Sequence, residues 1–182
     1  MLKYLVGIDP GWKNLGFAIT RVDKNGFIFK EFTCVMDPSS FSSPTKFIEE
    51  LDRVIISSGI NKIHSVTIER FVAYAGVSTA ETENICMLIG SLVYYFAASG
   101  YWGVEPLLVR AIDWKTQLVK LLYKQKGFDN PSPKLDKKFS IAAAKACLDM
   151  ENVFKTDHEA DALCLACLPE LITKGKKNVT VV

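Results

Sequence analysis

Three segments with the composition of β-strands follow one another within the first 35 residues, and this order limits the folds that the chain can form. Each segment is rich in apolar, β-branched or aromatic residues and ends near a turn residue. These strands are expected at Lys3 to Asp9, Leu15 to Val22 and Phe27 to Val35. The tripeptide Lys24-Asn25-Gly26 between the last two is typical of a hairpin turn. We therefore expect the chain to begin with an antiparallel meander.

The rest of the sequence alternates between helical and strand patterns. Helices are expected at Pro44 to Ser58, Ser78 to Ser99, Trp114 to Tyr123, Phe139 to Leu148 and Thr156 to about Thr173. Strands are expected at His64 to Glu69 and Pro106 to Ala111, and a loop at Gly127 to Pro133. This order predicts a single α/β domain over residues 1–174, with a mixed sheet flanked by helices, and a loose tail over residues 175–182.

The composition is that of a globular protein, with 49% hydrophobic and 23% charged residues. No apolar run reaches the roughly 18 residues of a membrane span, and the apolar part of the N-terminus is too short for a secretory signal. The five cysteines are odd in number and lie mostly in apolar stretches, so we expect reduced thiols in a cytoplasmic protein. Cys164 and Cys167 form a C-x-x-C pair without a second pair, so we interpret them as core thiols.

The net charge of +2 does not by itself indicate a nucleic-acid partner, but the charges are unevenly distributed. From Arg110 to Lys138, eight lysines and arginines face three acidic residues. Such a run is either a solvated helical face or a surface that binds phosphates. The acidic residues gather later, at Asp149, Glu151, Asp157, Glu159 and Asp161. A basic surface beside clustered carboxylates is what a metal-dependent nuclease requires.

The expected helix from Ser78 to Ser99 is apolar on more than one side. It starts with the capping box Ser78-x-x-Glu81. One apolar stripe consists of Ile85, Leu88, Leu92 and Phe96, and another of Cys86, Ile89, Val93 and Ala97. A helix that is apolar all round is buried on both sides, so we expect a partner subunit to cover the second side.

Four residues able to bind a metal stand at the ends of expected elements: Asp9, Glu69, His158 and Asp161. Strand ends and a helix start can converge at one edge of a sheet, and a divalent cation offsets the cost of burying carboxylates together. Each residue also has an ordinary explanation, such as a turn residue for Asp9 and a surface histidine for His158. We assign Glu159 to the capping box Thr156-x-x-Glu159 and Asp157 to the helix dipole.

Three motifs in this order resemble the RuvC family of Holliday junction resolvases. They are Asp9-Pro10-Gly11 followed by Gly16, then Ile68-Glu69, and then His158-Glu159-Ala160-Asp161-Ala162-Leu163. The resemblance spans nearly the whole chain and implies a ribonuclease H-like fold with a mixed five-stranded sheet. It also implies a homodimer that acts on four-way DNA junctions, with two divalent metal ions, Mg²⁺ or Mn²⁺, in each active site. Its metal ligands would be Asp9, Glu69, His158 and Asp161, where His158 replaces an aspartate that is more frequent in the family.

The resemblance also suggests residues that contact DNA. Phe71, with Tyr74 as the alternative, would be an aromatic residue inserted at the junction centre, although ordinary packing explains either one. Lys115 would lie near the scissile phosphate, where we expect it to be catalytic. Lys138 would lie on the DNA-binding face, and the basic run adds Arg110, Lys134 and Lys137 to the expected DNA contacts.

The expected activity is a structure-selective DNA endonuclease that hydrolyses phosphodiesters in Holliday junctions or other branched DNA and leaves 5′ phosphates. The helix from Ser78 to Ser99 would form the dimer interface. The alternatives are a ribonuclease H-type nuclease that acts on RNA–DNA hybrids and a junction-binding protein without catalytic activity. An actin-like or sugar-kinase ATPase also begins with an Asp-x-Gly loop, but that class needs a second phosphate loop in a second domain, which this sequence lacks.

Overall fold

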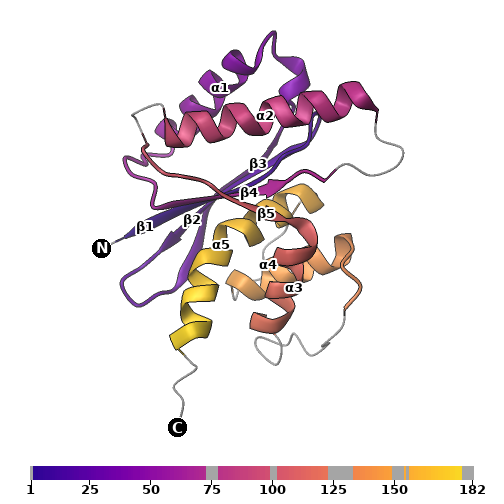
Figure 1. The fold of residues 1–182 in the computed structure, drawn as a ribbon. Coiled ribbons are helices and arrows are strands. Elements are labelled where there is room, and N and C mark those ends of the chain that lie inside the picture. The colour runs from indigo at the N-terminus through magenta and orange to yellow at the C-terminus, as the bar shows by residue number, and fades with distance from the viewer. Residues whose placement is uncertain are drawn as a thin grey trace.

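The protein forms a five-stranded sheet with helices on both faces (Figure 1). The computed structural model describes residues 2–72, 78–98, 102–122, 133–148, 154 and 156–177. The strands are β1 (Lys3–Asp9), β2 (Leu15–Val22), β3 (Ile28–Met36), β4 (Ser65–Arg70) and β5 (Leu107–Arg110). The helices are η1 (Pro38–Ser40), α1 (Pro44–Ser57), α2 (Thr79–Ala97), α3 (Ala111–Leu122), α4 (Lys137–Leu148) and α5 (Asp157–Lys177).

The sheet is mixed, with the strand order β3-β2-β1-β4-β5. The first three strands pair antiparallel and form the expected meander, while β4 pairs parallel to β1 and β5 parallel to β4. The hairpin between β2 and β3 turns at Gly26, which has a φ of 84°, and Asp23 accepts hydrogen bonds from the backbone N–H groups of Asn25 and Phe27. The predicted α/β fold with a mixed sheet is confirmed.

Helices α3 and α5 differ most in extent from the sequence prediction, and α1, α2 and α4 differ from it by one to three residues in total. Helix α5 continues to Lys177, where a tail was expected from residue 174 or 175 onward. The Lys174 ammonium group donates a hydrogen bond to the Gly26 carbonyl, so contact with the hairpin stabilises this extra turn. Helix α3 starts at Ala111, three residues earlier than expected, because it follows β5 without a loop. The expected loop at 127–132 and the remaining tail at 178–182 lie outside the described residues.

Alternating side chains of the sheet form two separate cores. On β1, Val6 and Ile8 belong to the core under α1 and α2, whereas Leu5 belongs to the core shared with α3, α4 and α5. Figure 1 shows the same arrangement, with α1 and α2 above the sheet and α3, α4 and α5 below it. The period of two along a strand assigns Gly7 and Asp9 to the α5 side as well. The cores therefore determine which face Asp9 occupies.

Two glycines allow α5 to lie directly on the sheet. A Cβ atom on Gly7 would lie 2.0 Å from the Ala162 carbonyl oxygen, and one on Gly16 would lie 2.1 Å from the His158 carbonyl oxygen. Both distances are too short for real contacts, so only glycine fits at these positions. Because Gly16 is the pairing partner of Asp9, this close approach places the first turn of α5 beside the end of β1.

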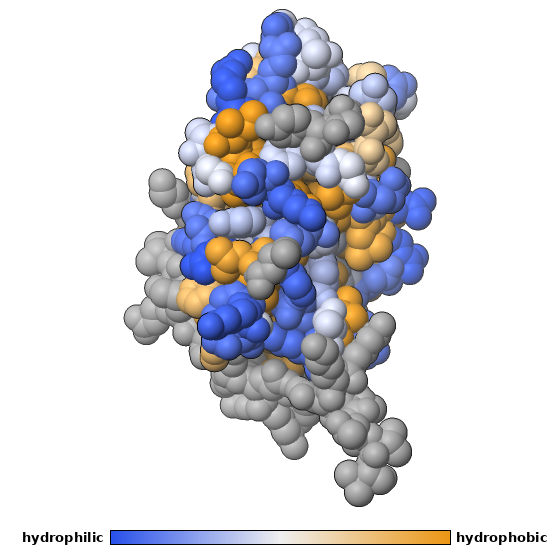
Figure 2. Space-filling model, turned by 90° about the vertical axis from the view of Figure 1, so that its left-hand side faces the viewer, coloured by the Kyte–Doolittle hydropathy of each residue, from blue (hydrophilic) through white to orange (hydrophobic). Residues whose placement is uncertain are grey.

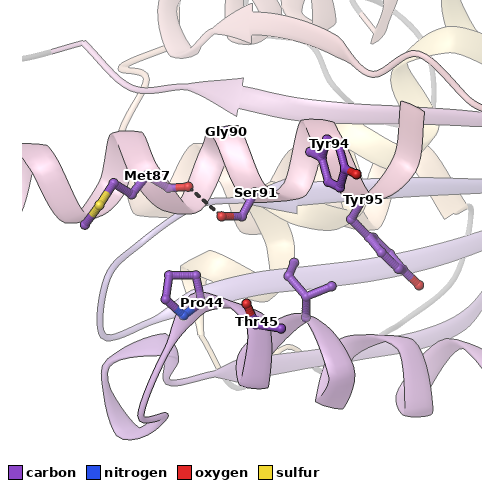
Figure 3. Close-up of a pocket in the computed structure, with 8 residues that line it drawn as sticks. Pro44, Thr45, Met87, Gly90, Ser91, Tyr94 and Tyr95 are labelled. Carbon is purple, nitrogen blue, oxygen red and sulfur yellow. Dashed lines mark hydrogen bonds between the residues drawn. The ribbon is translucent and has the colours of Figure 1, made fainter. Parts of the chain in front are cut away.

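Helix α2 buries one of its two apolar stripes. Ile85, Leu88, Leu92 and Phe96 are buried, whereas Cys86 of the other stripe is exposed and the rest of that stripe is half-buried. A cavity of about 600 Å³ lies between α1 and α2 and is lined by Pro44, Thr45, Ile48, Met87, Gly90, Ser91, Tyr94 and Tyr95 (Figure 3). Met87 and Tyr94 are 53% and 67% exposed. The outer side of α2 thus remains partly apolar within one chain.

The surface and the cysteines agree with a globular protein. The face shown in Figure 2 carries its hydrophobic residues in separate small groups between hydrophilic ones. No helix among the described residues is long and apolar enough to cross a membrane. All five cysteines are free thiols, and Cys164 and Cys167 are buried in the core as expected.

Candidate active site

Two of the four predicted ligands stand side by side on adjacent parallel strands. The register pairs Ile8 of β1 with Ile68 of β4, so Asp9 and Glu69 follow at the same level. Both side chains belong to the sheet face that α5 covers, because their neighbours Ile8 and Ile68 face the opposite core. The parallel pairing of β1 and β4 therefore gathers two carboxylates at one edge of the sheet.

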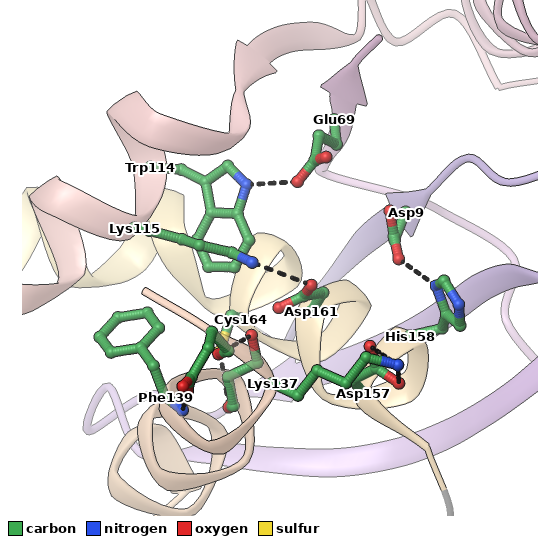
Figure 4. A network of polar contacts seen from close by, with 12 residues as sticks. Asp9, Glu69, Trp114, Lys115, Lys137, Phe139, Asp157, His158, Asp161 and Cys164 are labelled. Carbon is green, nitrogen blue, oxygen red and sulfur yellow. Dashed lines mark hydrogen bonds and ion pairs between the residues drawn. The ribbon is translucent and has the colours of Figure 1, made fainter. Parts of the chain in front are cut away.

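The first turns of α5 supply the other two predicted ligands. The Thr156 hydroxyl accepts a hydrogen bond from the Glu159 backbone N–H at 3.2 Å, which caps the helix start as the sequence predicted. His158 and Asp161 are three residues apart and lie on the same side of the helix. Figure 4 shows both side chains near Asp9, with Glu69 on the adjacent strand. The structure thus brings all four predicted residues to one end of the sheet.

Asp9 and His158 form a direct pair. The Nδ1 atom of His158 lies 2.7 Å from Oδ2 of Asp9, and the two side chains are 34% and 13% exposed. The hydrogen bond with Asp9 raises the pKa of His158 above its usual value of 6.5, against the opposing effect of burial. In this arrangement the imidazole tends to hold a proton and neutralises the Asp9 carboxylate.

Glu69 is the most strongly perturbed carboxyl group in the site. Burial, and then the charge of Asp9, raise its pKa from 4.5 to about 7, while a hydrogen bond from Trp114 acts in the opposite direction. That bond joins Trp114 Nε1 to Glu69 Oε2 over 2.7 Å. A glutamate with a pKa near neutrality in a polar cluster is typical of a functional site.

Asp161 pairs with Lys115, and both side chains are nearly buried. The ammonium Nζ lies 3.2 Å from Asp161 Oδ2, and the side chains are 14% and 13% exposed. Burial raises the pKa of Asp161, and the charge of Lys115 opposes this shift. The second carboxylate oxygen, Oδ1, is buried and has no hydrogen-bond partner among the described residues. A buried acceptor without a partner costs about 1–3 kcal/mol unless a ligand satisfies it.

The donor set fits a hard divalent cation in its chemistry, although not as the side chains are now arranged. Three carboxylates and one imidazole are ordinary ligands for Mn²⁺. Mg²⁺ also binds carboxylates, but it prefers ligand sets made of oxygen atoms. A cation would satisfy Asp161 Oδ1 and would offset the repulsion that Asp9 exerts on Glu69. However, no three His, Cys, Asp or Glu side chains in the described ranges are grouped closely enough to hold one ion. Before these residues could hold an ion, Lys115 would have to leave Asp161, and His158 Nδ1 would have to exchange its contact with Asp9 for the ion.

The predicted DNA contacts lie at different distances from this cluster. Lys137, at the start of α4, is 78% exposed and lies 3.2 Å from Asp157, next to His158. Lys134 and Lys138 are exposed, and Phe71 is half-buried just after β4. Arg110 is exposed and forms two hydrogen bonds with Asp113. The alternative aromatic residue, Tyr74, lies outside the described residues, as do Lys124 and Lys126 of the basic run.

Sequence reasoning did not identify two residues at this edge. Trp114 resembles a core residue because it shares a helical stripe with Leu118 and Leu122, and all three are buried. Only the need of a buried indole N–H for a partner could have indicated a role. Arg70 ends β4 directly after Glu69, is exposed, and pairs in register with Arg110. Two arginines side by side could have been predicted once the two strands were known to be adjacent.

The sheet order and the acidic edge define an α/β protein with a ribonuclease H-like fold. No protein-family model matches the sequence, and no curated protein sequence matches it significantly. The fold is nevertheless similar to that of Thermus thermophilus RuvC, with a TM-score of 0.66 and 16% identity over 95% of this chain and 96% of that one. For the same protein in complex with a Holliday junction substrate, the TM-score is 0.67 and the identity 15%, over 94% of this chain and 96% of that one. For the yeast mitochondrial Holliday junction resolvase, the TM-score is 0.60 and the identity 14%, over 96% of this chain and 80% of that one.

At these identities the likeness establishes the fold, which is that of the RuvC-type resolvases. The resemblance predicted from the three sequence motifs is therefore confirmed at the level of the fold.

Proposed function

We propose that this protein is a metal-dependent endonuclease that cuts Holliday junctions or other branched DNA and leaves 5′ phosphates. The observation that carries the proposal is the gathering of Asp9, Glu69, His158 and Asp161 at one sheet edge of a RuvC-type fold. A protein that only binds DNA has no need of buried, mutually repelling carboxylates, which destabilise the folded state.

The same four residues would hold two divalent metal ions, Mg²⁺ or Mn²⁺. Ions of this kind activate the attacking water and stabilise the leaving 3′ oxygen in phosphodiester hydrolysis. Asp9 stands next to both Glu69 and His158, which suits a ligand shared by the two ions. Lys115 lies within the cluster, and after release from Asp161 its ammonium group would neutralise charge on the scissile phosphate.

The surface around the site suits branched DNA. Lys134, Lys137 and Lys138 are exposed near the start of α4, and Arg70 and Arg110 lie side by side at the ends of β4 and β5. These cations would contact phosphates, while Phe71, one residue after Arg70, would stack on bases at the branch point. Structures similar to this chain include one solved with a Holliday junction substrate, which supports the choice of substrate.

We also propose that the active form is a homodimer built through α2. The exposed Met87 and Tyr94 and the half-buried second stripe give α2 an apolar side that the described part of the chain leaves partly uncovered. A twofold axis would direct two identical active sites at two strands of a four-way junction.

The direct test is a cleavage assay with end-labelled substrates of matched sequence. The substrates are a four-way junction, a three-way junction, an RNA–DNA hybrid and a linear duplex, each with Mg²⁺ or Mn²⁺. We expect the junctions to be cut and their nicks to be sealed by DNA ligase without prior phosphorylation, which reports 5′ phosphates. Preferential cleavage of the hybrid would indicate a ribonuclease H instead, and tight junction binding without any cleavage would indicate a binding protein.

A further inference from the structure

Each of the three carboxylates at this sheet edge contacts one nitrogen-bearing side chain: Asp9 contacts His158, Glu69 contacts Trp114, and Asp161 contacts Lys115. These contacts differ in whether they could persist once a cation binds. His158 Nδ1 lies 2.7 Å from Asp9 Oδ2 and would have to give up this contact to bind an ion itself. The Lys115 ammonium group lies 3.2 Å from Asp161 Oδ2, and its positive charge would repel an ion at that oxygen. Trp114 donates to Glu69 through a neutral indole N–H, which has no net charge to compete with a cation. The contact between Trp114 and Glu69 is therefore compatible with metal binding as it stands.

We infer that Trp114 is a positioning residue, which holds the Glu69 side chain in the orientation that binds metal through its hydrogen bond to Oε2. The inference rests on the proposed metal site and adds a residue to it. The bond uses one of the two carboxylate oxygens and leaves Oε1 for an ion. Donors that orient a metal ligand in this way contribute strongly to affinity in many metalloproteins.

The indole is itself fixed by its surroundings, as a positioning group must be. Trp114 is 1% exposed and packs in the core with Leu118 and Leu122 of the same helix. Its ring also has the Lys115 ammonium group 4.9 Å from its centroid, so the two consecutive residues of α3 are held together. Trp114 contacts Glu69 on β4, and Lys115 contacts Asp161 on α5. Helix α3 thus connects two ligands that come from different elements, as Figure 4 shows.

The bond from Trp114 Nε1 to Glu69 Oε2 restricts the rotation of the Glu69 carboxylate. A carboxylate that is oriented before the metal arrives loses less conformational freedom on binding than one free to rotate.

The matched pair of variants is Trp114→Phe and Trp102→Phe. Each removes one buried indole N–H and keeps an aromatic ring, but Trp102 donates to the Tyr95 hydroxyl at 2.6 Å, in the core under α1 and α2. Calorimetric titration of each protein with Mn²⁺ measures the affinity. We expect Trp114→Phe to bind Mn²⁺ about 10- to 100-fold more weakly. Trp102→Phe should bind it as the wild type does.

Cleavage kinetics provide a second readout. If Trp114 acts through Glu69 and the metal, the Mn²⁺ concentration that gives half-maximal rate should rise in Trp114→Phe. The rate at saturating Mn²⁺ should recover most of the wild-type value. A fall in the saturated rate with unchanged Mn²⁺ dependence would overturn the inference, because it would indicate damage elsewhere in the site.

A third measurement needs no variant and remains decisive if Trp114→Phe folds poorly. The three tryptophans give three indole N–H resonances in a ¹⁵N-labelled sample, and Mg²⁺ can be titrated into wild-type protein. The Trp114 resonance should shift with the same dissociation constant that calorimetry gives for Mg²⁺, and the Trp102 resonance should stay in place. A Trp114 resonance that does not move at saturation would overturn the inference.

The results separate this inference from the function on which it rests. Wild-type protein that binds neither Mn²⁺ nor Mg²⁺ would overturn the metal site and the role of Trp114 together. Wild-type binding that Trp114→Phe fully retains would overturn only the role of Trp114 and would leave the proposed nuclease intact.

Discussion

His158 Nδ1 lies 2.7 Å from Asp9 Oδ2, so the last helix meets the end of the first strand through an imidazole–carboxylate pair 149 residues apart in sequence. Gly16 makes this pair possible, because it lets the backbone of His158 approach the strand that pairs with Asp9. The pair raises the pKa of His158, since the neighbouring carboxylate stabilises the imidazolium form. Metal binding must displace that proton before the imidazole can act as a ligand.

The first prediction concerns the pH dependence of cleavage. A protonated imidazole cannot coordinate, so the rate should fall as pH drops through the pKa of His158. The hydrogen bond with Asp9 raises the pKa of His158 above its ordinary value of 6.5, so this acid limb of the pH–rate profile should lie above pH 6.5. Imidazole is also a softer ligand than carboxylate, so Mn²⁺ should support faster cleavage than Mg²⁺. His158→Asp should flatten the acid limb and shift the preference toward Mg²⁺.

Cleavage rates measured across pH in each metal check this prediction. The matched control is His64→Gln, because the only other histidine contacts the Tyr4 backbone and lies away from the carboxylates. An unchanged acid limb and an unchanged metal preference in His158→Asp would remove His158 from the ligand set.

The second prediction concerns the stability of the metal-free protein. The pKa of Glu69 is about 7 in the folded state, whereas the ordinary value of a glutamate is 4.5. A raised pKa means that the folded state binds the proton more tightly. This contribution to stability is present in full below pH 4.5 and is lost as pH rises to about 7. One pKa unit corresponds to about 1.4 kcal/mol, so the loss attributable to Glu69 is at most about 3.5 kcal/mol.

Urea unfolding at several pH values, with a metal chelator present, measures this loss. Glu69→Gln should show a shallower decline in unfolding free energy across the same window, and added Mn²⁺ should restore stability to the wild type at pH 8. Parallel curves for the two proteins would show that Glu69 does not titrate in this range.

Part of this site follows from the sequence, and part depends on the folded chain. Asp9 and Glu69 could be predicted because each is a carboxylate at the end of an apolar strand and both belong to one ordered set of motifs, although Asp9 alone could have been a turn residue. His158 and Asp161 could be predicted because their spacing places them on one side of a helix start. The pairing of Lys115 with Asp161 and of Trp114 with Glu69 could not, since both depend on how α3 packs against β4 and α5. Helical periodicity assigns Trp114 to the core, and this is also correct.

The fold shows the same division. The bounds of β1 and β2 could be predicted to the residue, because turn residues delimit two strongly apolar segments. The end of α5 could not, because residues 174–177 are three lysines and a glycine without an apolar pattern, and it is the contact of Lys174 with the hairpin that favours a longer helix. Gly7 and Gly16 look like ordinary strand glycines in the sequence, and only the packed helix shows why a side chain is excluded there.

The third prediction concerns the basic residues. Junction binding should weaken with salt, and alanine at Lys115, Lys137 and Lys138 should each lower the salt slope by about one for every phosphate that is no longer neutralised. Lys46→Ala is the matched control, since Lys46 is an exposed lysine on α1, over the opposite face of the sheet. Gel-shift titrations in Ca²⁺ at several salt concentrations measure the slope. If the triple variant keeps the wild-type affinity and slope, these lysines form only a solvated face.

The fourth prediction concerns assembly through α2. Tyr94 is 67% exposed beside the cavity between α1 and α2, so Tyr94→Asp should weaken self-association by about tenfold or more. Phe27→Asp, at an aromatic residue that is 64% exposed by the β2–β3 hairpin, should leave association unchanged. Sedimentation velocity distinguishes the two. A wild-type protein that stays monomeric at micromolar concentration, with and without DNA, would contradict the proposed dimer.

The proposed nuclease is tested most sharply by comparing wild type with Asp9→Asn on a labelled four-way junction. Cleavage is followed in Mn²⁺, and binding is followed in Ca²⁺ by gel shift. We predict that the wild type cuts the junction, and that Asp9→Asn binds it with similar affinity but does not cut it, because an amide cannot supply the negative charge that the metal ions require. Equal cleavage by both proteins, or loss of binding together with cleavage in Asp9→Asn, would contradict an active site built on Asp9.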